Sequence, residues 1–251
     1  MKVLESLTER VVTLIRGRRI NEFALLSELF SGKKGIEIGG PSKIFRNRGF
    51  IPLYKIVKEL DGCNYANATL WDRNKTRGKE YIYNNNKKGI QYISEATDLS
   101  FSQDYKYDFL VSAHCLEHVA NPLKAMEEWI RIVKKGGHLL LVLPNKEFCF
   151  DHKRPVTKFA HLMEDYRNNT KDDDMTHLAE ILKLHDLRMD RSAGTFEQFS
   201  ERSLKNPENR ALHQHIFDMA VIKEIFNHFN LEILLTFEGR EYIIAGKVNA
   251  A

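Results

Sequence analysis

The stretch EATDLSFSQDYKYDFLVSAHCLEHVANPLKAMEEWIRIVKKGGHLLLVLPN, residues 95–145, decides the fold of this chain. It contains a short apolar strand, Phe109–Ala113, an amphipathic helix, Pro122–Val133, and a second apolar strand, His138–Leu143. The glycines of a Lys-Gly-Gly turn end the helix before the second strand. A helix between two apolar strands is typical of parallel pairing, because a parallel connection needs a long crossover.

The residues upstream continue this alternation. Gly35–Ile38 predicts a first strand that breaks at Gly39 and Gly40, and further strands are expected at Gly62–Ala66 and Gln91–Ser94. Helices that alternate with buried strands favour an α/β fold with a doubly wound, mostly parallel sheet.

The C-terminal part predicts a different pairing. A helix at Phe217–Asn230 precedes two strands, Leu231–Phe237 and Glu241–Val248, which only a short turn separates. Such close strands must form an antiparallel hairpin. We therefore expect a seven-stranded sheet that ends in an antiparallel hairpin.

Residues 146–212 are too long for a plain connection. We expect helices there near Thr157–Asn168, Met175–Leu184 and Thr195–Leu204, which form a helical lid inserted after the fifth strand. Residues 1–31 are expected to form two N-terminal helices, the first with an apolar stripe from Leu4 to Ile15. The sequence thus predicts a single domain over residues 1–251.

Composition excludes several function classes. Of the 251 residues, 43% are hydrophobic and 29% charged, which is typical of a globular protein. The net charge of +4 and the short basic clusters do not indicate a nucleic-acid partner. No apolar run reaches the ~20 residues of a membrane span. Three cysteines without metal-site spacing favour free thiols in a reducing, cytoplasmic compartment.

The motifs together resemble the class I S-adenosylmethionine-dependent methyltransferases. The resemblance rests on the acidic, glycine-broken first strand, on Leu116-Glu117-His118 after the fourth strand, and on Asn121-Pro122. It covers residues 35–145 and 212–248 and implies S-adenosylmethionine as cofactor and S-adenosylhomocysteine as product. Of the family's three spaced glycines, only Gly39 is in register.

The resemblance also implies the cofactor-binding residues. The acid before the first turn would accept from the methionine ammonium group, and an acid that ends the second strand would hold the ribose. Asn64 stands at that second position, and Asp61 stays open as the alternative. The adenine is expected at the turn after the third strand. The cofactor-binding residues expected on these grounds are Glu37, Gly39, Gly40, Pro41, Asn64, Glu95, Ala96, Asp98 and His114.

Several of the ten histidines are expected near the active end of the sheet. Methyl transfer to a hydroxyl needs a group that takes the proton, and His is suited to this at neutral pH. His114, His152 and His215 are the predicted catalytic residues, as proton acceptors or substrate-orienting groups. His118 is expected to have a structural role.

A divalent metal is possible but not favoured, so no metal ligand is assigned. The pairs His161 with Glu164-Asp165 and His177 with Glu180 share helix faces, but charged helices contain such pairs routinely.

A narrower resemblance concerns the acceptor. The segments 39–42, 151–157 and 213–218 resemble those of bacterial methyltransferase-domain proteins linked to surface polysaccharide and glycolipid assembly. This favours O-methylation of a sugar or glycoconjugate. N- or C-methylation of another small molecule and a non-catalytic, partner-binding module remain open. A nicotinamide-dependent reductase fits less well, because Pro41 interrupts the glycine fingerprint that such enzymes need.

Overall fold

The computed structural model describes residues 19–66, 80–84 and 87–249. The expected first helix, with its stripe from Leu4 to Ile15, lies outside the described residues. The elements, in chain order, are α2 (Phe23–Phe30), β1 (Lys34–Ile38), η1 (Lys43–Phe45), η2 (Leu53–Lys55), β2 (Glu59–Asn64), β3 (Glu80–Asn84), β4 (Lys87–Ile93), β5 (Tyr107–Ala113), η3 (Leu116–His118), α3 (Pro122–Ile132), β6 (Val133–Pro144), η4 (Lys146–Phe148), α4 (Phe159–Asn168), α5 (Leu178–Leu184), α6 (Phe196–Leu204), α7 (Asn206–Asn209), α8 (Met219–His228), β7 (Leu231–Glu238) and β8 (Glu241–Val248).

The strands form one twisted sheet in the order β3-β4-β2-β1-β5-β6-β8-β7. The strands β4, β2, β1, β5 and β6 are parallel, and β8 and β7 close the sheet as the expected antiparallel hairpin. The expected count of seven strands is wrong. An eighth, β3, pairs antiparallel with β4 at the other edge. Its alternating exposure is that of an edge strand with one buried face, too short to predict from periodicity.

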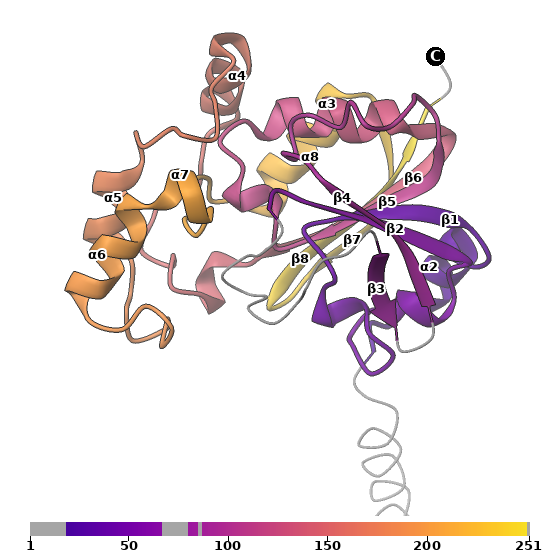
Figure 1. The fold of residues 1–251 in the computed structure, drawn as a ribbon, viewed down its shortest axis with the longest axis horizontal. Coiled ribbons are helices and arrows are strands. Elements are labelled where there is room, and N and C mark those ends of the chain that lie inside the picture. The colour runs from indigo at the N-terminus through magenta and orange to yellow at the C-terminus, as the bar shows by residue number, and fades with distance from the viewer. Residues whose placement is uncertain (1–18, 67–79, 85–86, 250–251) are drawn as a thin grey trace, which may run out of the picture.

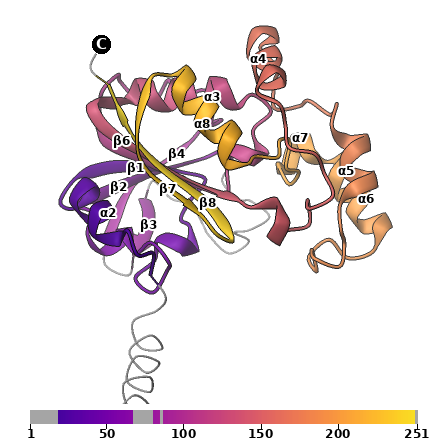
Figure 2. The same cartoon turned by 180° about the vertical axis from the view of Figure 1, so that it is seen from behind.

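Helices cover both faces of the sheet (Figures 1 and 2). On one face, α3 and α8 bury an apolar cluster that includes Trp129, Phe226 and the β6 residue Leu141. On the other face, α2 and the η1–η2 segment cover a second cluster that includes Phe30 and Leu140. Neighbouring residues of β6 thus enter opposite cores, as side chains of a strand do.

The expected helical insertion follows β6 and contains α4, α5, α6 and the short α7, which was not expected. Leu162 of α4 joins the core over α3 and α8. The α5–α6 part projects from the side of the sheet (Figure 1) and has a small apolar cluster of its own around Ile181 and Phe199. In the described ranges, no helix has the length and apolarity needed to cross a bilayer.

Candidate active site

A large cavity of about 1520 Å³ opens at the carboxyl ends of the parallel strands. Its wall contains residues that directly follow β1, β2, β4, β5 and β6: Gly39, Gly40, Pro41, Ser42, Tyr65, Ser94, Glu95, Ala96, His114, Cys115 and Asn145. The strand order reverses at β1, because β2 lies on one side of it and β5 on the other. Open α/β sheets bind their ligands at such a switch point.

The turn after β1 needs its first glycine. Gly39 has φ +83°, and a Cβ added there would lie 2.8 Å from Cβ of Cys115. A larger residue would therefore meet both backbone strain and a clash. Gly39, Gly40 and Pro41 of this turn line the cavity.

Glu37 lies below this turn and is fully buried. Its Oε2 accepts hydrogen bonds from Tyr54 (2.7 Å) and Tyr81 (2.6 Å), and its Oε1 accepts from the backbone N–H and hydroxyl of Ser42. Burial raises the pKa of Glu37, and these hydrogen bonds oppose the rise. The carboxylate thus braces the turn from behind, and Glu37 is not part of the cavity wall.

Of the two residues considered for the ribose, Asn64 lines the cavity and Asp61 does not. Asn64 lines the cavity, and its Nδ2 donates to the carbonyl of Gly40 at 3.0 Å, which leaves Oδ1 as the acceptor. Asp61 is buried within the sheet, where it accepts from the backbone of Ile90 and the hydroxyl of Tyr107. Only Asn64 faces the position expected for a ribose.

Of the residues expected near adenine, Glu95 and Ala96 line the cavity. Glu95 forms an ion pair with Arg210 at 2.8 Å, and the Ala96 carbonyl accepts from the buried indole of Trp129. Asp98 lies outside the cavity wall and accepts from the backbone N–H of Ser100.

His114 leaves β5 into the cavity with φ +52°, a backbone conformation that His tolerates better than most residues. Its Nδ1 lies 3.6 Å from Glu117 and its Nε2 lies 3.3 Å from Glu241. Burial lowers the pKa of His114, but the two carboxylates outweigh burial and raise it to about 10. His114 is therefore a cation at neutral pH.

The other two histidines expected to be catalytic lie outside the cavity wall. His152 is bound to Asp186 at 3.0 Å in the insertion. His215 is almost fully buried, with Nε2 3.1 Å from the carbonyl of Ala120. His118, expected to be structural, contacts the carbonyl of Leu212 through Nδ1 but also lines the cavity.

The sequence-based assignment missed His213, which lines the cavity. Its Nδ1 lies 2.5 Å from Oδ2 of Asp151, and the buried Arg154 donates to both Oδ1 of Asp151 and the carbonyl of His213. Burial opposes ionisation of Asp151, yet His213 and Arg154 hold its pKa below the usual range. A carboxylate that accepts from Nδ1–H leaves Nε2 of the imidazole as the proton acceptor. The sequence does not reveal this contact, because 62 residues separate His213 from Asp151.

Comparison with known proteins shows which family the chain belongs to. A family model described as a methyltransferase domain matches residues 15–236. The chain belongs to this family. The family match supports methyl transfer as the activity. A comparison with curated proteins found no match.

Solved methyltransferases show a similar fold. One from Mesorhizobium loti is 9% identical, with 90% of this chain and 95% of that chain covered and a TM-score of 0.51. A possible histamine N-methyltransferase from Thermotoga maritima is 17% identical (97% and 96% covered, TM-score 0.48). One from Aquifex aeolicus is 13% identical (94% and 93% covered, TM-score 0.46). At 9% identity, the similarity to the Mesorhizobium loti structure supports the fold alone.

The cavity of this methyltransferase fits the family's cofactor. The glycine turn, Asn64 and Ala96 lie in its wall along three successive strand ends, as a nucleoside attached to an amino acid requires. Its volume exceeds that of an ordinary single-ligand site, so an acceptor can bind beside the cofactor.

Two groups of described side chains have ligand atoms close enough to share a metal ion. One is Glu117, His118 and His213, beside the cavity. The other is His161, His177 and His215, between the insertion and the sheet.

Proposed function

We propose that this methyltransferase methylates a hydroxyl group of a sugar or glycoconjugate, with His213 as the proton acceptor. The observation that carries the proposal is the contact of the buried Asp151 with His213, which lines the cavity. An imidazole whose Nδ1 is held by a carboxylate is the arrangement that accepts a proton from a hydroxyl at Nε2. An amine acceptor has less need of it, because an unprotonated amine is already nucleophilic.

The reaction needs few groups. A lone pair of the acceptor oxygen forms the new C–O bond, and the S–CH3 electron pair stays on sulfur, which becomes the thioether of S-adenosylhomocysteine. The hydroxyl proton moves to Nε2 of His213. The cofactor supplies the electrophilic methyl group, so the protein's part is to align the acceptor and take the proton.

His114 is suited to orient the acceptor. Because Glu117 and Glu241 keep it protonated, it donates hydrogen bonds and does not accept the proton at neutral pH. We assign His114 to this substrate-orienting role and His213 to proton transfer. His152 and His215 lie outside the cavity wall, and we assign structural roles to both.

Basic side chains line the cavity beside acidic and aromatic ones. Arg19, Lys43, Arg46 and Arg240 line the cavity, and Arg240 also lies over the ring of Phe148. Guanidinium groups bind carboxylate and hydroxyl oxygens through several N–H donors. These basic groups support a hydroxylated, acidic glycoconjugate as the acceptor. The three free cysteines are consistent with a cytoplasmic location.

The first test is calorimetric titration with S-adenosylhomocysteine, followed by turnover assays with sugar and glycoconjugate acceptors. Binding in the micromolar range and methylation of a hydroxyl are the expected results. His213→Ala should lower kcat by about 10²–10⁴-fold and leave S-adenosylhomocysteine affinity intact. His228→Ala, at an exposed position, is the matched control.

Two outcomes contradict the proposal. Turnover of His213→Ala at the wild-type rate removes His213 from the reaction. Absence of cofactor binding at millimolar concentration favours a non-catalytic module that binds partners.

A further inference from the structure

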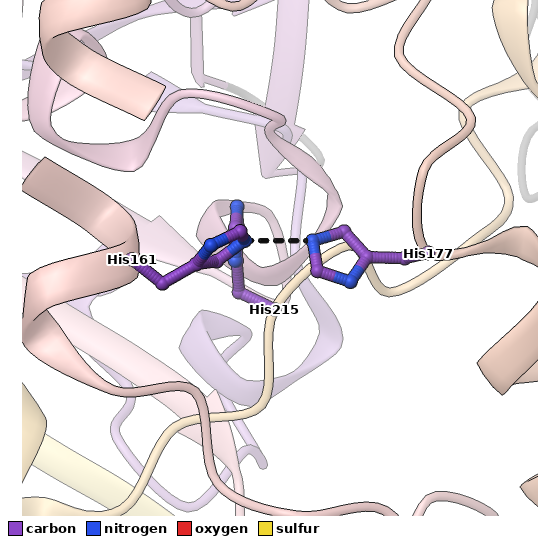
Figure 3. A group of neighbouring side chains, drawn as sticks. All are labelled: His161, His177 and His215. Carbon is purple, nitrogen blue, oxygen red and sulfur yellow. Dashed lines mark hydrogen bonds between the residues drawn. The ribbon is translucent and has the colours of Figure 1, made fainter. Parts of the chain in front are cut away.

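Three imidazoles from separate parts of the chain meet where the insertion joins the sheet (Figure 3). His161 lies on α4, His177 precedes α5, and His215 lies in the segment before α8. One ring nitrogen of each lies within 4.8 Å of the others. None of the three lines the large cavity, so the group is separate from the candidate active site.

The distances are those of ligands around a small cation. Nε2 of His161 lies 3.1 Å from Nε2 of His177 and 3.5 Å from Oδ2 of Asp165. The His215 ring lies beside this carboxylate, with its Nε2 3.7 Å from Oδ2 of Asp165, and one of its two nitrogens lies within 4.8 Å of ring nitrogens of His161 and His177. Ligands at zinc distances on the corners of a tetrahedron are about 3.4 Å apart. The group therefore needs only small adjustments to surround one ion.

Asp165 has a carboxylate oxygen that lacks a partner. Its Oδ1 accepts from the hydroxyl of Thr170, while its buried Oδ2 has no hydrogen-bond partner among the described residues. Buried polar atoms are nearly always satisfied, so such an oxygen needs an explanation. A cation between the imidazoles and Oδ2 supplies one.

His215 shows the same deficit. It is 1% exposed, its Nε2 lies beside the carbonyl of Ala120, and its Nδ1 has no partner in the described ranges. Metal-bound imidazoles use one nitrogen for the metal and donate from the other to a carbonyl or carboxylate. His161 has a comparable outer partner, because its Nδ1 lies 3.7 Å from Glu164.

We propose that His161, His177, His215 and Asp165 bind one divalent transition metal of the zinc class, which joins the insertion to the core. Nitrogen and carboxylate ligands at tetrahedral spacing are typical of zinc, and four protein ligands close the site to substrates. The role is therefore structural. A structural metal would also stabilise the α5–α6 part, because the apolar cluster of that part is small.

Protonation at the site is compatible with metal binding. Burial, with the neighbouring His161 and Arg154, lowers the pKa of His177, and burial lowers that of His215 to about 3. Burial raises the pKa of Asp165.

The test measures metal content and thermal stability of the full chain. Protein dialysed against a chelator and reloaded with Zn²⁺ should hold about one zinc per chain and gain at least about 5 °C in Tm. Co²⁺ in place of zinc should give the visible absorption of a tetrahedral site. His177→Ala should lose the metal and the gain in Tm. His177→Cys, which offers another zinc ligand, should retain both.

Two controls locate the ion. Glu201→Gln changes an exposed acid of α6, outside the histidine group, and should leave zinc content unchanged. His213→Ala disrupts the other metal-capable group, Glu117 with His118 and His213, and should also retain zinc. Zinc lost from His213→Ala but kept by His177→Ala overturns the proposal, as does absence of stoichiometric metal in the wild type. Neither result depends on methyl transfer.

Discussion

Nδ1 of His213 lies 2.5 Å from Oδ2 of Asp151, although 62 residues separate them. Arg154 holds both residues from behind, through Oδ1 of Asp151 and the carbonyl of His213. The insertion, which contributes Asp151 and Arg154, is therefore a part of the candidate active site and not only a cover over it. The arrangement leads to specific predictions for this site and for the cofactor turn.

Replacement of Asp151 by Asn should impair turnover more than binding. An amide cannot stabilise the imidazolium that forms when His213 accepts the proton, so we expect kcat to fall about 100-fold or more with little change in KM. Steady-state kinetics on the acceptor check this. Asp173→Asn, at an exposed position of the insertion, serves as control. Equal losses in kcat for both variants would contradict the role of the pair.

Glu37→Gln should act mainly through the fold of the cofactor turn. The amide places N–H donors against the hydroxyls of Tyr54 and Tyr81, which now donate to the carboxylate. We expect the free energy of unfolding to fall by about 3 kcal/mol. S-adenosylhomocysteine should also bind at least about tenfold more weakly, because the turn loses its brace.

Chemical denaturation and calorimetry measure these two effects of Glu37→Gln. The control is Glu59→Gln, which removes a partly exposed acid that pairs with Lys34 at the edge of β2. Weaker binding without loss of stability would instead indicate direct contact between Glu37 and the cofactor, as the sequence resemblance implies.

Asn64→Ala should weaken cofactor affinity about tenfold, since one ribose hydrogen bond and the tie to Gly40 are both lost. Calorimetry with S-adenosylhomocysteine and with methylthioadenosine, which keeps the ribose but lacks the amino acid, should show the same loss. Asn47→Ala, an exposed change, is the control. Unchanged affinity for both ligands would remove Asn64 from the ribose site.

The positive charge of His114 predicts that stability and KM depend on pH in the alkaline range. Its folded-state pKa of about 10 lies above the ordinary value, so the stability that its ion pairs contribute is complete below about pH 6.5 and is lost as the pH rises through 10. If the imidazolium orients the acceptor, KM should rise over the same alkaline range. Glu241→Gln removes one of its two carboxylates and should shift this transition to lower pH.

An NMR titration of the His114 ring and the pH profile of KM measure that shift. Lys247 is bound to Glu232 near the far end of the hairpin, and Glu232→Gln therefore serves as control. An unchanged His114 titration in Glu241→Gln would contradict the assigned ion pair.

Much of the fold follows from local patterns. The strands β1, β5 and β6, the helix α3 and the terminal hairpin are all marked by apolar periodicity and glycine stops, which act within a few residues. The edge strand β3 was missed because its alternation is short and half exposed. The second strand lies at Glu59–Asn64, earlier than expected, since pairing with β1 and β4 sets its register.

The sequence by itself determined the α/β architecture, the glycine turn and the methyltransferase family, because these depend on local spacing and short motifs. Only the tertiary structure decided which side chains meet. It buried Glu37 behind the turn, directed Asn64 and not Asp61 to the cavity, and paired Asp151 with His213. Contacts between distant segments depend on how the insertion packs against the sheet, and no spacing along the chain encodes that packing.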